Sequence, residues 1–348
     1  MKIALVAPPF ISVPPKRYGG TELFVGELAL GLAKRGIELT LYTNGESTLS
    51  VPKKWFYEKQ DWPLSGEAEA NLKGLNHAAW AVKDASGDAD VMHLNSAAGL
   101  PLSHLTDAPV VYTVHHAYEP PMNKFYEGFP EVAFVTISDF QRSRLRVRNA
   151  RTIHHGIEMA KYTLQENKQQ YLSFLGRIAP TKGAHLAIEI AQKSGIPLKM
   201  AGEIQPLYRE YWERAIKPKV DGKFIEYVGE VGLREKNELL GSSKAMLFPI
   251  QWDEPFGLVM IESMACGTPV LALPGGSVEE VVKDGVSGCV RATAAELADC
   301  ARNLEFQPRV VRAYAEAKFS SDRMVEQYIE LYSEILGLPV AHEDRVVA

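Results

Sequence analysis

The sequence predicts an α/β protein with two doubly wound, parallel-sheet domains. Its 348 residues exceed the ~150 of a typical single domain, which favours two domains. Short apolar runs alternate with helical patterns from one end of the chain to the other. These runs are nearly continuous in apolar residues, which is typical of parallel strands that helices cover on both faces.

The first half holds six predicted strands, rich in Val, Ile, Leu and aromatic residues and mostly bounded by Gly, Pro, Asn or Asp. They cover residues 2–7, 37–43, 90–94, 109–115, 132–137 and 151–154. Between the first two strands, residues 21–34 place apolar side chains along one helical face. Segment 51–70 is irregular and aromatic, and we favour a packed excursion over a loop that covers a cleft.

The second half repeats the alternation, with predicted strands at 171–175, 197–201, 224–228, 244–248, 269–273 and 287–290. Ser138-x-x-Gln141 in the first half and Thr293-x-x-Glu296 in the second are capping-box patterns, which indicate helix starts. A last helix after Ser320 carries apolar residues on one side. A polar stretch separates the halves, so we predict domains at 1–163 and 164–321.

Charge and cysteine content argue against several classes of protein. A net charge of −5 does not suit a nucleic-acid binder. The three cysteines form no C-x-x-C pair, which argues against a disulfide framework and a zinc cluster and suits a reducing cytoplasm. No apolar run reaches the ~18 residues of a membrane span. We therefore expect a cytoplasmic protein, with peripheral contact at the inner membrane face left open.

A basic run bears on that contact. It consists of Arg142, Arg144, Arg146, Arg148 and Arg151. On a helix, Arg144, Arg148 and Arg151 would share one face. We interpret this face as solvated, and contact with anionic lipid or with an anionic acceptor is the alternative.

Two glycines stand between the first strand and the helix that follows it. Gly19 and Gly20 let the backbone approach a ligand closely, and the helix presents unpaired N–H groups to an anion. A turn that only needs a positive φ explains the pair equally well. The pattern is not G-x-G-x-x-G, so it does not predict a dinucleotide site.

A second stretch follows the first strand of the second half. Gly176 and Arg177 come directly after that strand, and Lys182 stands five residues further on. Ligands of open α/β sheets bind at this end of the strands. Arg can bind a diphosphate bidentately and Lys adds a point charge, so the position favours an anion site over two solvated cations.

The most specific pattern follows the predicted strand at 244–248. Glu254 falls in the loop at the strand end, and Glu262 falls about two turns further along the next helix. Phe256, Gly257 and Leu258 would supply backbone N–H groups at the start of that helix. Two carboxylates there can bind sugar hydroxyls while the N–H groups hold a charged group. The alternative is an N-terminal helix charge and a salt-bridged Glu262, but an apolar helix start argues against it.

Together these residues resemble the retaining glycosyltransferases of the GT-B architecture, family 4, also described as glycosyl transferases group 1. The spacing from Glu254 to Glu262 is similar to the E-x7-E signature of that family. Gly176-Arg177 with Lys182-Gly183 is similar to its phosphate-binding stretch, and Gly19-Gly20 to its first-loop glycines. The resemblance implies two Rossmann-like domains that face each other across a cleft, with a C-terminal helix at about 322–348 completing the first domain.

The likeness extends to the end of the first domain. His115 is similar to the family's strand-end histidine, and residues 154–158 to its N-G-I-D turn. The chain departs from the family at His116, where Asp is frequent, and at His155 and Glu158, which replace Asn and Asp.

The resemblance implies a role for each site residue. Arg177 and Lys182 would neutralise the donor diphosphate, and Glu262 would hold the ribose hydroxyls. Glu254, with N–H groups near Gly257, would orient the transferred sugar, which His115 would contact from the first domain. The implied catalytic residues are Glu254, His115, Arg177 and Lys182. The implied donor-binding residues are Gly19, Gly20, Gly176, Arg177, Lys182, Glu254, Phe256, Gly257, Leu258 and Glu262.

The resemblance also implies the reaction. A hexosyl group would move from a nucleoside-diphosphate sugar, with UDP-hexose favoured because it is common, to a hydroxyl acceptor such as a glycan, a lipid-linked sugar or a small metabolite. No divalent metal and no further cofactor would be needed, because cationic side chains and a helix terminus replace the metal. Two alternatives stay open: an epimerase-like enzyme of the same architecture, and a nucleotide-sugar or glycan-binding module without turnover.

Overall fold

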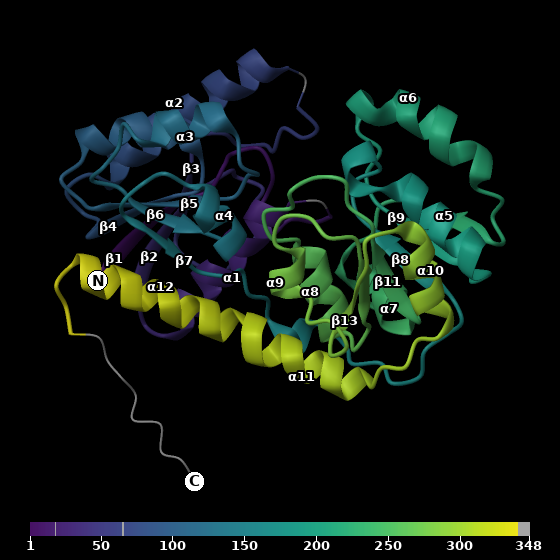
Figure 1. The fold of residues 1–348 in the computed structure, drawn as a ribbon. Coiled ribbons are helices and arrows are strands. Elements are labelled where there is room, and N and C mark those ends of the chain that lie inside the picture. Colours follow the sequence, from purple (N-terminus) through teal and green to yellow (C-terminus); the bar gives the residue numbers. More distant parts are fainter. Residues whose placement is uncertain (18, 65, 340–348) are drawn as a thin grey trace, which may run out of the picture.

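The computed structural model, which describes residues 1–17, 19–64 and 66–339, contains two parallel sheets in two lobes (Figure 1). The first sheet has the order β3-β2-β1-β4-β5-β6-β7 and the second the order β10-β9-β8-β11-β12-β13. The first contains β1 (Lys2–Val6), β2 (Glu38–Thr43), β3 (Lys53–Trp55), β4 (Val91–Leu94), β5 (Val110–Val114), β6 (Ala133–Thr136) and β7 (Ala150–Thr152). The second contains β8 (Leu172–Leu175), β9 (Leu198–Ala201), β10 (Ile225–Tyr227), β11 (Ala245–Phe248), β12 (Val270–Ala272) and β13 (Gly288–Val290). Neighbouring strands pair in parallel, which confirms the predicted fold class.

Helices pack on both faces of each sheet, as the unbroken apolar strands predict. They are α1 (Gly20–Lys34), α2 (Glu67–Ala85), α3 (Pro120–Tyr126), α4 (Asp139–Arg144), α5 (Ala184–Ser194), α6 (Arg209–Tyr211), α7 (Leu233–Ser242), α8 (Leu258–Ala265), α9 (Val278–Val281), α10 (Ala294–Arg302), α11 (Pro308–Phe319) and α12 (Ser321–Ile335). In β1, Ile3 and Leu5 pack into one core with α1 and α12, whereas Ala4 and Val6 pack into another with α2. Successive side chains of a strand point to opposite faces, so residues 3–6 of β1 are buried by one layer or the other, and only Lys2 at the strand start is exposed.

Both predicted capping patterns lie at helix starts. The Ser138 hydroxyl accepts a hydrogen bond from the Gln141 N–H and begins α4. Thr293 and Glu296 form the complete reciprocal capping box at the start of α10. The capping box is confirmed at Thr293, whereas at Ser138 only the serine cap forms, because the Gln141 side chain accepts from the N–H of Ile137 and not from that of Ser138.

The last two helices link the lobes. They run end to end beneath both lobes, α11 under the second and α12 under the first (Figure 1). Side chains of α12 join the core of the first sheet, namely Met324, Val325, Tyr328, Leu331 and Tyr332. Gly31 of α1 makes room for α12, because a Cβ there would lie 2.3 Å from a methyl carbon of Val325. The predicted helix at 322–348 ends at Ile335 in the structure, and its last residues, 340–348, lie outside the described part of the chain.

Segment 51–70 differs from a simple packed excursion. It contributes the edge strand β3, which the sequence did not predict because the strand has three residues and two of them are exposed. Its end reaches the second lobe, where the Trp62 indole N–H donates to the Glu203 carboxylate over 3.0 Å. The segment therefore both packs on its own lobe and contacts the other one.

The basic run does not form a helical face, so that part of the interpretation was wrong. Helix α4 ends at Arg144, Leu145 is extended, and β7 begins at Ala150. Beyond Arg144 the chain is no longer helical: the Leu145 side chain is buried, and β7, which contains Arg151, pairs with β6. Arg151 instead forms an ion pair with Glu334 of α12.

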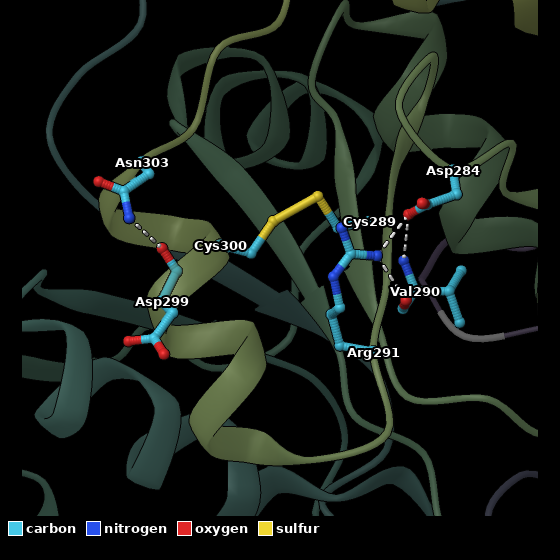
Figure 2. The surroundings of a disulfide bond; sticks show 7 residues. All are labelled: Asp284, Cys289, Val290, Arg291, Asp299, Cys300 and Asn303. Carbon is cyan, nitrogen blue, oxygen red and sulfur yellow. Dashed lines mark hydrogen bonds and ion pairs between the residues drawn. A yellow bond between two sulfur atoms is a disulfide. The ribbon is translucent and has the colours of Figure 1, made fainter.

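A disulfide joins Cys289 of β13 to Cys300 of α10, contrary to the expectation that the cysteine number and spacing gave, because the fold places the two residues side by side (Figure 2). The chain turns back between the two residues, so α10 packs beside the strand that it follows. Cys266 is free and buried.

Among the described residues, no helix combines the length and apolar character that crossing a bilayer requires.

Candidate functional site

A cavity of about 700 Å³ lies between the lobes. It opens at the carboxyl ends of strands from both sheets, where ligands of open α/β sheets bind. Every site residue proposed from the sequence lines it: Gly19, Gly20, His115, Gly176, Arg177, Lys182, Glu254, Phe256, Gly257, Leu258 and Glu262. Its volume falls within the range of small-molecule sites, about 300–1,000 Å³.

Two helix N-termini meet at this cavity from opposite lobes. Gly19 caps α1 with φ 145°, and a Cβ there would lie 2.8 Å from Pro15. Gly257 caps α8 with φ 81°. A Cβ on Gly20 would lie 3.6 Å from the Leu258 side chain, so the two helix starts are in near contact. The first N–H groups of a helix lack partners within the helix, so the two starts favour an anion in the cavity.

Arg177 stands where two strands approach closely. A Cβ on Gly202, which follows β9, would lie 1.8 Å from the carbonyl oxygen of Gly176, so only glycine fits there. Arg177 follows directly, half-buried, in the turn after β8. The close packing places a guanidinium on the cavity wall.

Lys182 approaches the same wall from the turn before α5. Gly183, at φ 73°, lies so close to Pro249 that a Cβ would meet its carbonyl oxygen at 1.8 Å. The Lys182 ammonium lies 2.5 Å from a carboxylate oxygen of Glu254 and 4.6 Å from the ring centre of Trp252. The cation proposed for a diphosphate is thus also the partner of the first acidic residue.

Glu254 is buried and tightly held. The Trp252 indole N–H donates to Oε2 over 2.8 Å, and the Lys182 ammonium donates to the same oxygen. The backbone of the loop is fixed as well, because the Ser277 N–H donates to the Glu254 carbonyl oxygen over 2.9 Å. Within the described residues, no hydrogen bond reaches Oε1 of Glu254.

Glu262 lies in α8, and its carboxylate is also held by two donors on one oxygen. The Lys236 ammonium and the Tyr162 hydroxyl donate to Oε1 over 2.5 and 2.8 Å. Burial and the neighbouring Glu262 raise the pKa of Tyr162 well above its usual value, so Tyr162 keeps the proton that it donates. Over the described part of the chain, Oε2 of Glu262 also has no hydrogen-bond partner.

His115 follows β5 and has a defined tautomer. The Asn95 amide group donates to the carbonyl oxygen of Val6, so its Oδ1 faces the imidazole at 2.9 Å from Nε2. Nε2 must therefore donate its proton to Asn95. Burial, with smaller contributions from nearby histidines, holds the pKa of His115 well below its usual value. Nδ1 is then an acceptor, and it is buried without a hydrogen-bond partner among the described residues.

His155 stacks on His115 with ring centres 5.5 Å apart and an interplanar angle of 18°. Phe24 of α1 and Phe256 of the second lobe pack against the His155 ring. Burial lowers the pKa of His155 to about 3. The sequence singled out His155 only as a departure from a familiar turn, and the structure places it on the cavity wall between the lobes.

Several cavity residues were not predicted. Trp252 stands two positions before Glu254, and that proximity is the one signal that could have found it. Lys236, Tyr162 and Asn95 reach the site only through folding, and nothing in their local sequence marks them. Lys16 and Arg17 line the cavity on the side of the first lobe.

Outside the cavity, Asp139, His154 and Glu280 bring three potential metal-ligand atoms within 4.8 Å of one another. The Glu280 carboxylate already accepts hydrogen bonds from the N–H groups of Asp139 and Phe140 and pairs with the His154 imidazole. These contacts satisfy Glu280, so the group is explained as a set of hydrogen bonds that joins α9 of the second lobe to the first lobe.

Two protein-family models match the chain. The model described as Glycosyltransferase Family 4 matches residues 18–161, and the model described as Glycosyl transferases group 1 matches residues 157–312. Together they cover the two lobes, and the cavity lies where the two matched regions face each other.

Known proteins are similar over most of the chain. O-antigen chain mannosyltransferase C of Escherichia coli is 22% identical over 92% of this chain and 96% of that protein. D-inositol 3-phosphate glycosyltransferase of Mycolicibacterium smegmatis is 24% identical over 92% and 87%. The structure of Anabaena HepE in complex with UDP-glucose matches with a TM-score of 0.76 at 18% identity, over 96% of this chain and 100% of that one. This last likeness is one of fold.

Proposed function

Because the chain belongs to glycosyltransferase family 4, the glycosyl transferases group 1, and is therefore a glycosyltransferase, we propose that its cleft binds a nucleoside-diphosphate sugar and transfers the hexosyl group to a hydroxyl acceptor with retention of configuration. One observation carries this proposal. Two cations, Arg177 and Lys182, line one cavity together with two carboxylates, Glu254 and Glu262, and with the N-terminus of α8.

The chemistry needs charge on the leaving group. Transfer breaks the bond between the anomeric carbon and the diphosphate oxygen, and the acceptor oxygen forms the new bond while its proton passes to the departing phosphate oxygen. Negative charge grows on the diphosphate as the bond breaks. Arg177, Lys182 and the N–H groups at the start of α8 stabilise that charge without rearranging, and each such contact is typically worth roughly 10²–10³-fold in rate.

The carboxylates and the histidine orient the sugar and the nucleotide. The second oxygens of Glu254 and Glu262 accept hydrogen bonds from sugar and ribose hydroxyls, respectively. His115 lines the cavity on the side of the first lobe and contacts the transferred sugar there. Glu254 orients the sugar and is not assigned as a covalent nucleophile.

UDP-hexose is the favoured donor. Anabaena HepE, similar over nearly its whole length, was solved with UDP and with UDP-glucose. The acceptor is a hydroxyl of a glycan, a lipid-linked sugar or a small metabolite, in line with relatives named for the O-antigen chain and for inositol 3-phosphate.

The first lobe also offers a peripheral contact with anionic lipid through three exposed arginines, Arg144, Arg146 and Arg148.

The transfer is proposed to need no divalent metal, since cationic groups and a helix terminus line the cavity in which we propose that the diphosphate binds. A thermal-shift screen of UDP, GDP, ADP and dTDP, each with EDTA and with Mg²⁺, tests both points. A ligand at 100 times its Kd stabilises the fold by about 2.7 kcal/mol. We expect UDP to stabilise most and EDTA to change nothing. Stabilisation that appears only with metal, or by no nucleoside diphosphate, contradicts the proposal.

A further inference from the structure

Trp252 has an unusual position in the site, because it contacts both members of the central ion pair. Its indole N–H donates to Oε2 of Glu254 over 2.8 Å, and its ring lies under the Lys182 ammonium, 4.6 Å from ring centre to Nζ. Lys182 and Glu254 are themselves 2.5 Å apart. Trp252 is half-buried and lines the cavity, so its contacts lie within the site and not in the core.

The backbone around Trp252 is held on both sides. The N–H of Gln251 donates to the Thr181 carbonyl oxygen over 2.7 Å, which joins this loop to the turn that carries Lys182. A Cβ on Gly275 would lie 2.7 Å from the carbonyl oxygen of Trp252, so the next loop closes over it. Trp252 is therefore held by the two segments that flank the ion pair.

A carboxylate with one donor can rotate about its last bond and exchange its two oxygens. Glu254 has two donors on the same oxygen, Trp252 from its own loop and Lys182 from across the strand ends. An indole N–H is only a donor and is planar with its ring, so it fixes direction more narrowly than an ammonium does. With both donors on Oε2, Oε1 is the oxygen that stays available to a ligand.

We propose that Trp252 is a positioning residue for the transfer: its indole N–H fixes the Glu254 carboxylate so that Oε1 meets a hydroxyl of the transferred sugar, and its ring keeps Lys182 beside the diphosphate. This inference rests on the proposed function, and it deepens the role of Glu254 in that function. It predicts that the N–H and the ring of Trp252 have separable effects.

The separating variants are Trp252→Phe, which keeps a ring and removes the N–H, and Trp252→Ala, which removes both. The probes are UDP-glucose and GDP-mannose with water as the acceptor, so that hydrolysis of the donor releases the nucleoside diphosphate, which is the measured turnover; UDP and GDP are the binding ligands. We expect Trp252→Phe to lower kcat about tenfold, with donor KM and nucleotide affinity within about twofold of wild type. Trp252→Ala also weakens nucleotide binding, because Lys182 loses its support. Trp55→Phe, an exposed tryptophan outside the cavity, is the matched control and keeps wild-type turnover.

A double-mutant cycle with Glu254→Gln distinguishes positioning from a general structural role. If Trp252 acts through Glu254, Trp252→Phe has little further effect in the Glu254→Gln background. Independent, multiplying losses overturn the inference, as does unchanged kcat in Trp252→Phe while Glu254→Gln is slow. Normal turnover in Glu254→Gln instead overturns the proposed function, so the two failures are distinguishable.

Discussion

Glu254 and Glu262 are each bound on one carboxylate oxygen by a lysine and by an aromatic donor. A buried carboxylate without such partners would be costly, because it loses its hydration. The two donors on each carboxylate explain how Glu254 and Glu262 both stay in the wall of one cavity before a ligand binds. They also fix which oxygen of each group faces the ligand, which is the kind of preorganisation that transfer chemistry requires.

Tyr162→Phe tests the second of these arrangements. Loss of the hydroxyl leaves Glu262 with Lys236 alone, and the carboxylate gains freedom to turn. We expect the Kd for UDP to rise about tenfold, as loss of one hydrogen bond to a charged group predicts. Isothermal titration measures it, with Tyr171→Phe as control, since that hydroxyl bonds to the Leu239 carbonyl oxygen outside the cavity. Equal affinity in Tyr162→Phe and wild type would show that Glu262 needs no such support.

At the residue level, the sequence predicted the residues whose chemistry is marked by spacing and position. Glu254 and Glu262 are set by one loop and one helix, and Arg177 by a strand end. The residues that support them could not be predicted in this way. Tyr162 lies 100 positions from Glu262, and Asn95 lies 20 from His115, so only the fold brings them together. A lysine such as Lys236 on a polar helix is more often solvated, which hides its role.

Among the elements, three glycine turns hold the site in place. Gly183, Gly257 and Gly276 have φ between 60° and 81°, and a Cβ on any of them would meet a neighbour at 2.7 Å or less. The Gly183 turn carries Lys182, and Gly257 begins α8. Gly276 packs on the backbone of Glu254, where its Cβ would lie 2.2 Å from the carbonyl oxygen.

Gly276→Ala therefore disturbs the site through the backbone. We expect turnover to fall at least tenfold and the free energy of unfolding to fall by about 1–3 kcal/mol, because the loop must move and the residue is strained. Gly285→Ala is the control, since Gly285 has φ 74° but nothing within 4 Å of its Cβ position. It has the backbone strain without the clash. If both variants lose the same stability and keep full turnover, the Gly276 contact is not what holds Glu254.

The elements themselves were predictable where apolar periodicity was strong. The central strands and the capped helices α4 and α10 lie where the sequence placed them. Two features were not. Strand β3 is short and exposed, so it lacks a pattern, and the arginine run was assigned to a helix although strand pairing at β7 ends that helix early.

On the scale of the whole molecule, the lobes are joined at several points around the cavity. Helices α11 and α12 cross from the second lobe to the first, and the Glu280–His154 pair and the Trp62–Glu203 hydrogen bond add two contacts. The stacked His115 and His155 rings lie between Phe24 of one lobe and Phe256 of the other. Neutral, buried histidines are therefore part of the interface.

These histidines predict how stability depends on pH. Burial lowers the pKa of His93 and His155 to about 3 and that of His77 to about 4, below the value near 6.5 of an unfolded chain. As pH falls through about 6.5, protons bind to the unfolded chain first, so the free energy of unfolding decreases down to about pH 4 for His77 and about pH 3 for His93 and His155. Above pH 7 these groups have no such effect.

Urea unfolding at pH 7.5 and 5.5 measures this change. His155→Asn removes one such group, and we expect a smaller loss of stability between the two pH values. Leu207→Gln, at an exposed residue that does not titrate, should leave the loss as in wild type. A midpoint that does not move between pH 7.5 and 5.5 would mean that the folded protein and the unfolded chain bind protons equally over this range, which contradicts the lowered histidine pKa values.

The central claim is that Arg177 contacts the diphosphate of a nucleotide bound in the cavity. Titration calorimetry tests this claim most directly. It compares UDP with UMP and, as a second pair, GDP with GMP. We predict that wild type binds one diphosphate at least tenfold more tightly than its monophosphate, and that Arg177→Ala loses most of this preference while Arg144→Ala, outside the cavity, retains it. A wild-type protein that does not distinguish diphosphate from monophosphate, or an Arg177→Ala variant that keeps the full preference, would contradict the account.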